Sequence, residues 1–129
     1  MWSMANKYNA QKTERKMPNG ELHTFDSQKE ARRYDELALL LRAGKIRNLK
    51  LQPQFTLQES YISSDGDRVM AIRYTADFSY ERSTEPDQNG EIWWVKVVED
   101  VKSRASKTEA YEIRHRLLQE RFGVTLREV

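Results

Sequence analysis

The residues with the clearest chemical potential end an apolar run, Val97-Val98-Glu99-Asp100-Val101-Lys102. We expect this run to be a β-strand. Because successive side chains of a strand point to opposite faces, Asp100 and Lys102 should emerge on the same face. A carboxylate beside an ammonium group can hold a divalent cation and polarise a phosphate or a water molecule. The pattern therefore predicts phosphodiester chemistry.

Two further carboxylates extend this set, Asp77 on an earlier predicted strand and Glu30 on a predicted helix. Asp77 and Asp100 would supply the oxygen ligands that a hard cation such as Mg²⁺ or Mn²⁺ prefers, and the backbone carbonyl of Val101 could supply another. Lys102 would lower the pKa of the attacking water or neutralise the nonbridging phosphate oxygens. Glu30 would close the site from the helix as a further ligand.

Each of these residues also has a purely structural interpretation. Ser27 and Glu30 have the spacing of a capping box, so Glu30 either caps its helix or reaches toward the metal. Single Asp-x-Lys strings also arise by chance in proteins of this size. We interpret Glu99 as a surface charge at the strand end, although a one-residue bulge would exchange the roles of Glu99 and Asp100.

Periodicity and turn signals predict the helices and strands on which these residues lie. The pattern predicts a helix over 28–43 that stops at Gly44, then an extended segment that Gln52-Pro53 interrupts. It predicts two long strands joined by a turn at 85–90, an antiparallel hairpin that would place Asp77 and Asp100 on neighbouring strands. The first strand spans 68–80 with Asp77 pointing away from its apolar row, and the second spans 92–102.

The C-terminal part of the chain is predicted to form a helix and a last strand. Ser106 and Glu109 have a second capping-box spacing, which predicts a helix that runs to Phe122-Gly123. The alternating residues 124–129 predict a last strand. The fold class that we expect is α/β (α+β), with helices and a sheet.

The length and composition of the chain limit the classes of protein to which it can belong. The 129 residues suit one ordinary domain, and the absence of cysteine excludes a disulfide framework and a thiolate zinc site. No apolar run approaches the length of about 20 residues that spans a bilayer, and the N-terminus lacks a secretory signal. We therefore expect a soluble cytoplasmic protein without a membrane partner.

Charge is unevenly distributed along the chain. Residues 1–58 hold 11 Lys and Arg against 6 Asp and Glu, residues 59–100 hold 4 against 10, and residues 101–129 hold 7 against 4. Basic flanks around an acidic centre suit a protein that grips phosphates, although solvated helix faces would give the same pattern. The residues predicted to contact DNA phosphates are Lys7, Lys12, Arg15, Lys16, Lys107 and Arg114. Residues 1–24 read as a loose basic arm that ends in a turn, and residues 25–129 as a single domain.

The whole arrangement resembles the PD-(D/E)XK nuclease superfamily, and more closely a family of small phage and prophage proteins with a nuclease-like core. The resemblance covers most of the chain. Its carriers are Asn6-Lys7-Tyr8-Asn9, Phe25-Asp26-Ser27-Gln28-Lys29-Glu30-Ala31-Arg32-Arg33-Tyr34, Leu51-Gln52-Pro53-Gln54-Phe55, Tyr74-Thr75-Ala76-Asp77-Phe78 and Val98-Glu99-Asp100-Val101-Lys102. One departure is that alanine, rather than proline, precedes Asp77.

In that superfamily a helix glutamate, a strand aspartate and a final (D/E)-x-K act together, which here implies Glu30, Asp77, Asp100 and Lys102. The resemblance also implies a restriction-endonuclease-like mixed sheet of about four or five strands with helices on its faces. A basic or amide residue of the following helix often assists, and Arg114 or Gln119 would fill that role.

The expected function is that of a Mg²⁺- or Mn²⁺-dependent endodeoxyribonuclease that acts on branched or recombining DNA, as a Holliday-junction resolvase does. The expected setting is the cytoplasm of a phage-infected or lysogenic bacterial host. A homodimer would allow a small subunit with one site to cut both strands. The alternatives are a duplex nickase, a restriction-like enzyme, and a DNA-binding protein that keeps the fold without cleaving.

Overall fold

The computed structural model describes residues 11–101 and 108–129. The chain forms two compact units, one that ends at Gly44 and one that begins at Lys45. Each contains strands and a helix, which confirms the predicted α+β class. No helix within these described ranges combines the length and the apolar character that crossing a membrane requires.

The first unit begins with a β-hairpin. Strands β1 (Thr13–Lys16) and β2 (Leu22–Phe25) pair antiparallel, and a turn at Pro18-Asn19-Gly20 joins them. The sequence predicts a loose arm over residues 1–24. That prediction is wrong for the described residues, because cross-strand pairing orders the segment and α1 packs against it. The hairpin therefore belongs with the helix, and the contacts place the division of the chain at Gly44 rather than after residue 24.

Helix α1 (Gln28–Arg42) matches the helix predicted over 28–43. Its first turn is capped, because the Glu30 N–H donates to Ser27 Oγ at 3.1 Å. The core of this unit combines the buried side of the helix with Phe25 of the hairpin, whose ring lies 5.2 Å from that of Tyr34, centroid to centroid. The buried apolar residues are Phe25, Ala31, Tyr34 and Leu37.

The second unit is built on a four-stranded mixed sheet with the order β10-β9-β8-β3. Its strands are β3 (Ile46–Leu51), β8 (Phe78–Ser83), β9 (Trp94–Asp100) and β10 (Leu126–Glu128). The hairpin of β8 and β9 is antiparallel, as the turn at 85–90 predicts, and the C-terminal strand β10 adds parallel to β9. This confirms a mixed sheet of the predicted size.

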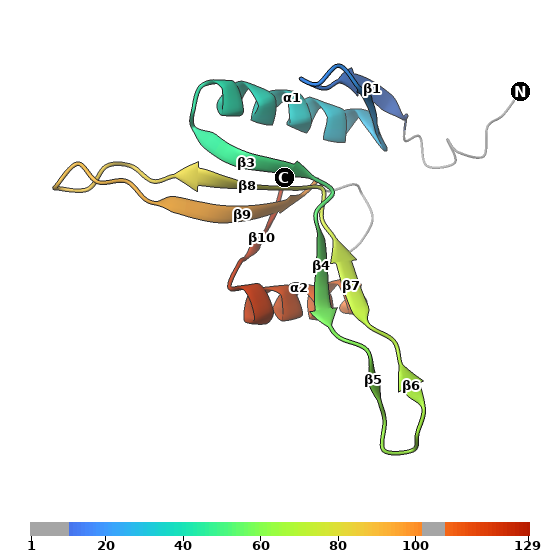
Figure 1. The fold of residues 1–129 in the computed structure, drawn as a ribbon. Coiled ribbons are helices and arrows are strands. Elements are labelled where there is room, and N and C mark those ends of the chain that lie inside the picture. The colour runs from blue at the N-terminus through green and yellow to red at the C-terminus, as the bar shows by residue number, and fades with distance from the viewer. Residues whose placement is uncertain (1–10, 102–107) are drawn as a thin grey trace, which may run out of the picture. The chain divides into compact units, whose positions relative to one another are not determined.

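A two-stranded ribbon leaves the four-stranded sheet (Figure 1). Strands β4 (Gln54–Gln58) and β7 (Ile72–Thr75) form its base, and the short strands β5 (Tyr61–Ile62) and β6 (Arg68–Val69) form its tip. The single strand predicted over 68–80 is therefore wrong, because it divides into β6, β7 and β8. Its apolar row does not stay on one face: Ala76 joins the core beneath α2, whereas Phe78 pairs with Glu99 on the other face of β9.

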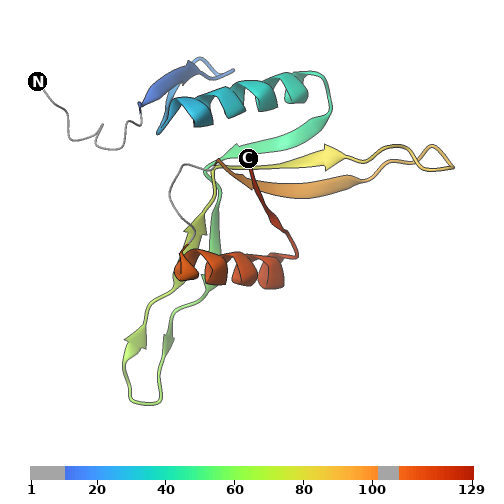
Figure 2. The same cartoon turned by 180° about the vertical axis from the view of Figure 1, so that it is seen from behind.

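Helix α2 (Glu109–Phe122) covers one face of the second unit, beside β4 and β10 (Figure 2). The helix begins later than its predicted start at Ser106, because Thr108 is the N-cap and its side chain accepts the Tyr111 N–H at 3.1 Å. It ends at Gly123 in the left-handed conformation, as predicted. The buried cluster beneath it contains Phe55, Leu57, Ala76, Val98, Leu118, Val124 and Leu126.

Candidate active site

The candidate site lies where the chain crosses between the ribbon and the four-stranded sheet. Two pairs of residues are hydrogen-bonded across this crossing: the Ala76 N–H donates to the Pro53 carbonyl at 3.1 Å, and the Gln52 N–H donates to the Asp77 carbonyl at 2.9 Å. Gln52 has a φ of 51°, which bends the chain sharply after β3. These bonds fix the backbone of Asp77 immediately before β8.

Asp77 and Asp100 lie together, as the hairpin prediction required. Asp100 is the last residue of β9, and one of its carboxylate oxygens accepts the Asp77 N–H at 3.2 Å. In return, a carboxylate oxygen of Asp77 accepts the Val101 N–H at 2.7 Å. Each carboxylate thus binds the backbone at or beside the other aspartate, so the two acids orient one another.

Tyr74 is a third member of this site, and the sequence analysis missed it. Its hydroxyl donates to the second carboxylate oxygen of Asp100. Partial burial, and next the hydrogen bond to Asp100, raise the pKa of Tyr74 above its ordinary value, so the hydroxyl remains a donor at neutral pH. Its position three residues before Asp77 carries no sequence signal, because the break between β7 and β8 decides where the ring points.

Two carboxylates held side by side repel one another. Hydrogen bonds from two backbone N–H groups and a tyrosine offset part of that repulsion, and a cation would offset more. The described residues contain no group of three or more Asp, Glu or His side chains arranged to hold a metal ion. Two carboxylates nevertheless fit Mg²⁺, which keeps several waters and usually takes only one or two carboxylates from the protein.

The other predicted members of the site are distributed as follows. Val101 lies beside the pair through its N–H, and the ligand role of its carbonyl stays a prediction. Lys102 lies outside the described residues. Glu30 is buried on the first turn of α1 in the other unit, so its convergence with the aspartates also stays a prediction.

Glu99 corrects the sequence interpretation. We expected a surface charge, but Glu99 is fully buried and its carboxylate accepts a hydrogen bond from the Tyr80 hydroxyl. Register explains the difference: Glu99 pairs with Phe78, which is also fully buried, whereas Asp100 lies on the opposite face of β9 and is half-buried. The pairing of β8 and β9 is regular up to Glu99, so Asp100 is the acid that meets Asp77.

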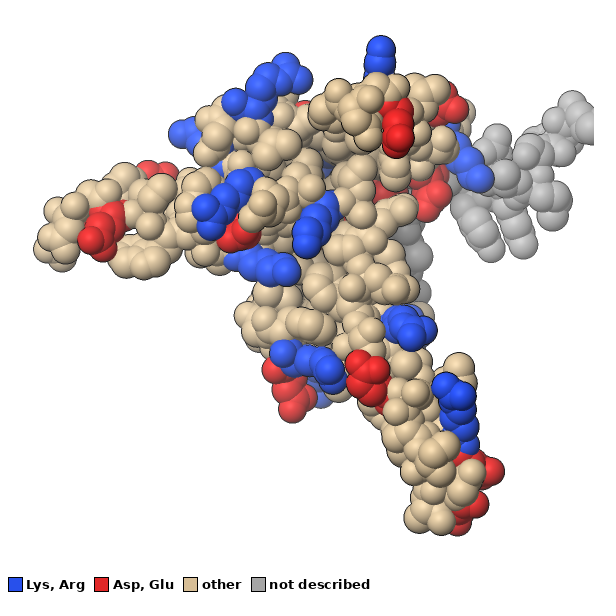
Figure 3. Space-filling view, viewed as in Figure 1, with Lys and Arg blue, Asp and Glu red and all other residues tan. Residues whose placement is uncertain are grey.

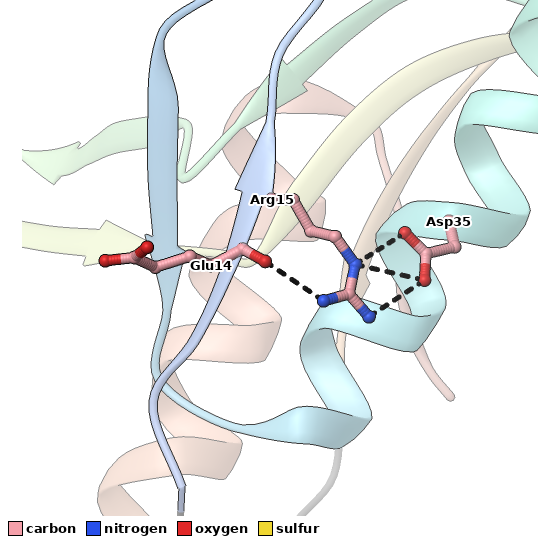
Figure 4. A network of polar contacts seen from close by, with 3 residues as sticks. All are labelled: Glu14, Arg15 and Asp35. Carbon is pink, nitrogen blue, oxygen red and sulfur yellow. Dashed lines mark hydrogen bonds and ion pairs between the residues drawn. The ribbon is translucent and has the colours of Figure 1, made fainter.

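The predicted phosphate-contacting residues lie in varied settings. Arg15 extends from the hairpin to α1 and forms a bidentate ion pair with Asp35, with Nε 2.9 Å from Oδ1 and Nη2 3.1 Å from Oδ2 (Figure 4). The hydrogen bond with Asp35 raises the pKa of Arg15. Its guanidinium therefore helps to hold the first unit together.

The other residues predicted to contact phosphates are exposed or lie outside the described residues. Lys12 and Lys16 are exposed in the first unit, and Arg114 is exposed on α2. Gln119, the alternative to Arg114 as the assisting helix residue, is also exposed on α2, and that role stays a prediction. Lys7 and Lys107 lie outside the described residues. Contact of any of these side chains with DNA stays a prediction.

Comparison with known proteins places the chain in a family without assigning it an activity. No significant match was found among curated proteins or among solved structures. Residues 5–128 match the family described as "Protein of unknown function (DUF1064)", which is almost the whole chain. The chain therefore belongs to the DUF1064 family.

Proposed function

We propose that this protein is a metal-dependent endodeoxyribonuclease of PD-(D/E)XK type. The observation that carries the proposal is the reciprocal pairing of Asp77 and Asp100 at neighbouring strand ends, with Lys102 two residues further along the chain. Two oriented carboxylates can hold a metal ion that activates water, and a lysine beside them can stabilise charge on a phosphate, so this set suits hydrolysis of a phosphodiester bond. The overall resemblance described from sequence adds Glu30 as the fourth member.

In this proposal each residue has a defined task. Asp77 and Asp100 hold Mg²⁺ or Mn²⁺, with the Val101 carbonyl and Glu30 as further ligands. When bound, the cation supplies an activated water and neutralises charge on the phosphate. Tyr74 keeps the Asp100 carboxylate in one orientation. Lys102 stabilises the charge that develops on the nonbridging oxygens.

The proposed substrate is branched or recombining DNA in a phage setting, within the cytoplasm of a bacterial host. A homodimer would bring two such sites to the two strands. Duplex nicking and restriction-like cutting use the same residues, so substrate geometry separates these activities.

The test is cleavage of labelled four-way junction, flap, linear duplex and single-stranded DNA with Mg²⁺ or Mn²⁺. Asp100→Asn removes the charge of one proposed ligand with little change of shape. The matched control is Asp65→Asn, which removes one carboxylate charge at the ribbon tip. Junction-selective cutting that Asp100→Asn abolishes and Asp65→Asn retains supports a resolvase.

Other outcomes redirect or reject the proposal. Cutting of plain duplex with the same dependence on Asp100 favours the nickase or restriction-like activity. DNA binding without any metal-dependent cutting rejects the nuclease and favours a DNA-binding protein on the same fold.

A further inference from the structure

A basic patch lies on one part of a face of the four-stranded sheet, beyond the part at Val98 and Leu126 that is buried beneath α2. The cross-strand partners Glu81 and Lys96 lie on the same face. The pairs Ser83–Trp94 and Ser79–Val98 flank them on that face, one pair on each side along the strands. Because side chains alternate along a strand, this is the face of β9 that also carries Asp100. Lys96 precedes Asp100 by four residues, which corresponds to about 13 Å along the strand.

A β-bulge adds a third cation to this face. Arg47 pairs with Glu81 and Lys50 pairs with Ser79, so three steps on β3 match two steps on β8. Without the extra residue Arg47 and Lys50 would point to opposite faces. Asn48 absorbs the irregularity with a φ of 54°, a conformation that asparagine tolerates. The bulge therefore places Arg47, Lys50 and Lys96 on one face.

The acid that pairs with Arg47 and Lys96, Glu81, is already engaged. Glu81 accepts hydrogen bonds from Asn48 and from Arg47, the latter at 3.2 Å, and these bonds lower the pKa of Glu81. The Arg47 guanidinium is 4.2 Å from the centre of the Trp94 ring, which holds it in place. Figure 3 shows Lys and Arg side chains around an acidic one over this part of the sheet.

Lys96 Nζ lies 5.9 Å from the centre of the Phe55 ring, and its charge helps to lower the pKa of Glu81. Lys50 and Lys96 are the two lysines of the patch. Both are exposed, and neither forms an ion pair with another described residue. They line a pocket of about 430 Å³ together with Asn48, Ser79, Tyr80, Trp94 and Glu81, whose carboxylate Arg47 and Asn48 already bind. An ammonium group on a flexible stem, beside hydroxyl and amide donors in a hollow, is suited to a phosphate group.

We infer that the patch of Arg47, Lys50 and Lys96 binds the phosphate backbone of DNA on the side of the sheet that carries Asp100. The inference rests on the proposed function and names where its substrate is held. Lys50 and Lys96 contact phosphates directly, whereas Arg47 is a positioning residue that neutralises Glu81 and shapes the pocket with Trp94.

The test is DNA binding without cleavage. Fluorescently labelled duplex and four-way-junction DNA are titrated with protein in EDTA over a series of NaCl concentrations. The variant is Lys50→Gln with Lys96→Gln, and the control is Arg68→Gln with Arg116→Gln, which removes two exposed charges from the ribbon tip and from α2. Loss of two phosphate contacts should weaken binding about tenfold and reduce the slope of log K against log[NaCl] by about 2.

The outcomes separate this inference from the proposed nuclease activity. If the Lys50 and Lys96 variant binds DNA with unchanged affinity and slope, the inference is overturned even when the wild-type protein cleaves. If the variant loses affinity and slope while the control does not, the patch is supported even when no substrate is cleaved. Equal binding of duplex RNA, with the same loss in the variant, overturns the assignment to DNA.

Discussion

Glu99 and Asp100 are adjacent residues of β9 that lie in opposite surroundings. Glu99 is fully buried on one face, where the Tyr80 hydroxyl donates to it. Asp100 is half-buried on the other face, where the Tyr74 hydroxyl and the Asp77 N–H donate to it. Both acids are thus held by a tyrosine, and Asp100 has a second carboxylate, that of Asp77, beside it.

Burial alone therefore does not distinguish the proposed metal ligand of this strand from a structural acid. A buried carboxylate with a hydroxyl donor contributes to folding, because leaving either group without its partner in the interior is costly. A carboxylate at a strand end, next to another carboxylate, favours cation binding. The contrast between Glu99 and Asp100 can be tested directly.

The largest expected effect is on cleavage by the Asp100→Asn variant. If Asp100 is a ligand, cleavage falls at least about 100-fold, because even loss of an outer-shell partner of a ligand costs up to about that factor. Glu99→Gln, which retains hydrogen-bonding capacity next to Tyr80, should retain cleavage. Rates on labelled DNA, with circular dichroism as a check of folding, measure both. Loss of cleavage in Glu99→Gln but not in Asp100→Asn would mean that Glu99, rather than Asp100, is the metal ligand.

The next effect is on stability. Glu99→Ala leaves a cavity and a buried Tyr80 hydroxyl without this acceptor, so the free energy of unfolding should fall by about 3 kcal/mol. Asp100→Ala should cost about 1 kcal/mol, because water can reach the half-buried site. Urea unfolding of both variants provides the measurement, and equal losses would contradict the assignment of Glu99 to the interior.

The two tyrosines should differ in the same direction. Tyr80→Phe removes the donor to a fully buried carboxylate and should cost about 2 kcal/mol, whereas Tyr74→Phe should cost about 1 kcal/mol. Tyr74→Phe should also weaken metal-dependent cleavage, because it releases one oxygen of Asp100. Unfolding midpoints and cleavage rates, measured on the same preparations, separate the two roles. A Tyr80→Phe variant with native stability would remove this contrast.

A third acid, Glu30, extends the comparison to the first unit. Ser27→Ala removes the helix cap and should cost about 1 kcal/mol of stability while cleavage by the folded protein is retained. If Glu30 is a ligand, Glu30→Gln should reduce cleavage while the stability stays close to that of the wild type. Thermal unfolding and cleavage assays give the two readouts, and native cleavage by Glu30→Gln would leave only a structural role.

The smallest effect is a dependence of stability on alkaline pH. Burial and Asp100 raise the pKa of Tyr74 in the folded state above the ordinary value of about 10. The stabilisation is complete below that value and declines as the pH rises, because the unfolded chain then releases a proton that the folded chain retains. Urea unfolding between pH 8.5 and 11 should show a shallower decline for Tyr74→Phe than for the wild type.

Much of the architecture could be predicted from local signals. The bounds of α1 follow from its cap and its apolar stripe, and the turn at 85–90 gives the antiparallel pairing of β8 and β9. That hairpin is also why the proximity of Asp77 and Asp100 was predictable. The last strand was expected, although its parallel pairing with β9 carries no local signal.

The rest depends on contacts between distant residues. Alternation of apolar residues continues through Ala76 and Asp77, so the sequence does not reveal that the chain changes sheets there. The bulge at Asn48 reverses the face of Lys50 without changing the pattern around it. The burial of Glu99 follows from its register with Phe78, which no local property of Glu99 predicts.

The crossing at Gln52 and Asp77 has a mechanical consequence. Both strands of the ribbon pass through it, and it is closed by the bonds from Gln52 to Asp77 and from Ala76 to Pro53. Bending of the ribbon relative to the four-stranded sheet would therefore change the backbone dihedral angles at Asp77, one of the two aspartates of the site. The rates of hydrogen exchange at the Gln52 and Ala76 amides would measure how often these two hydrogen bonds open.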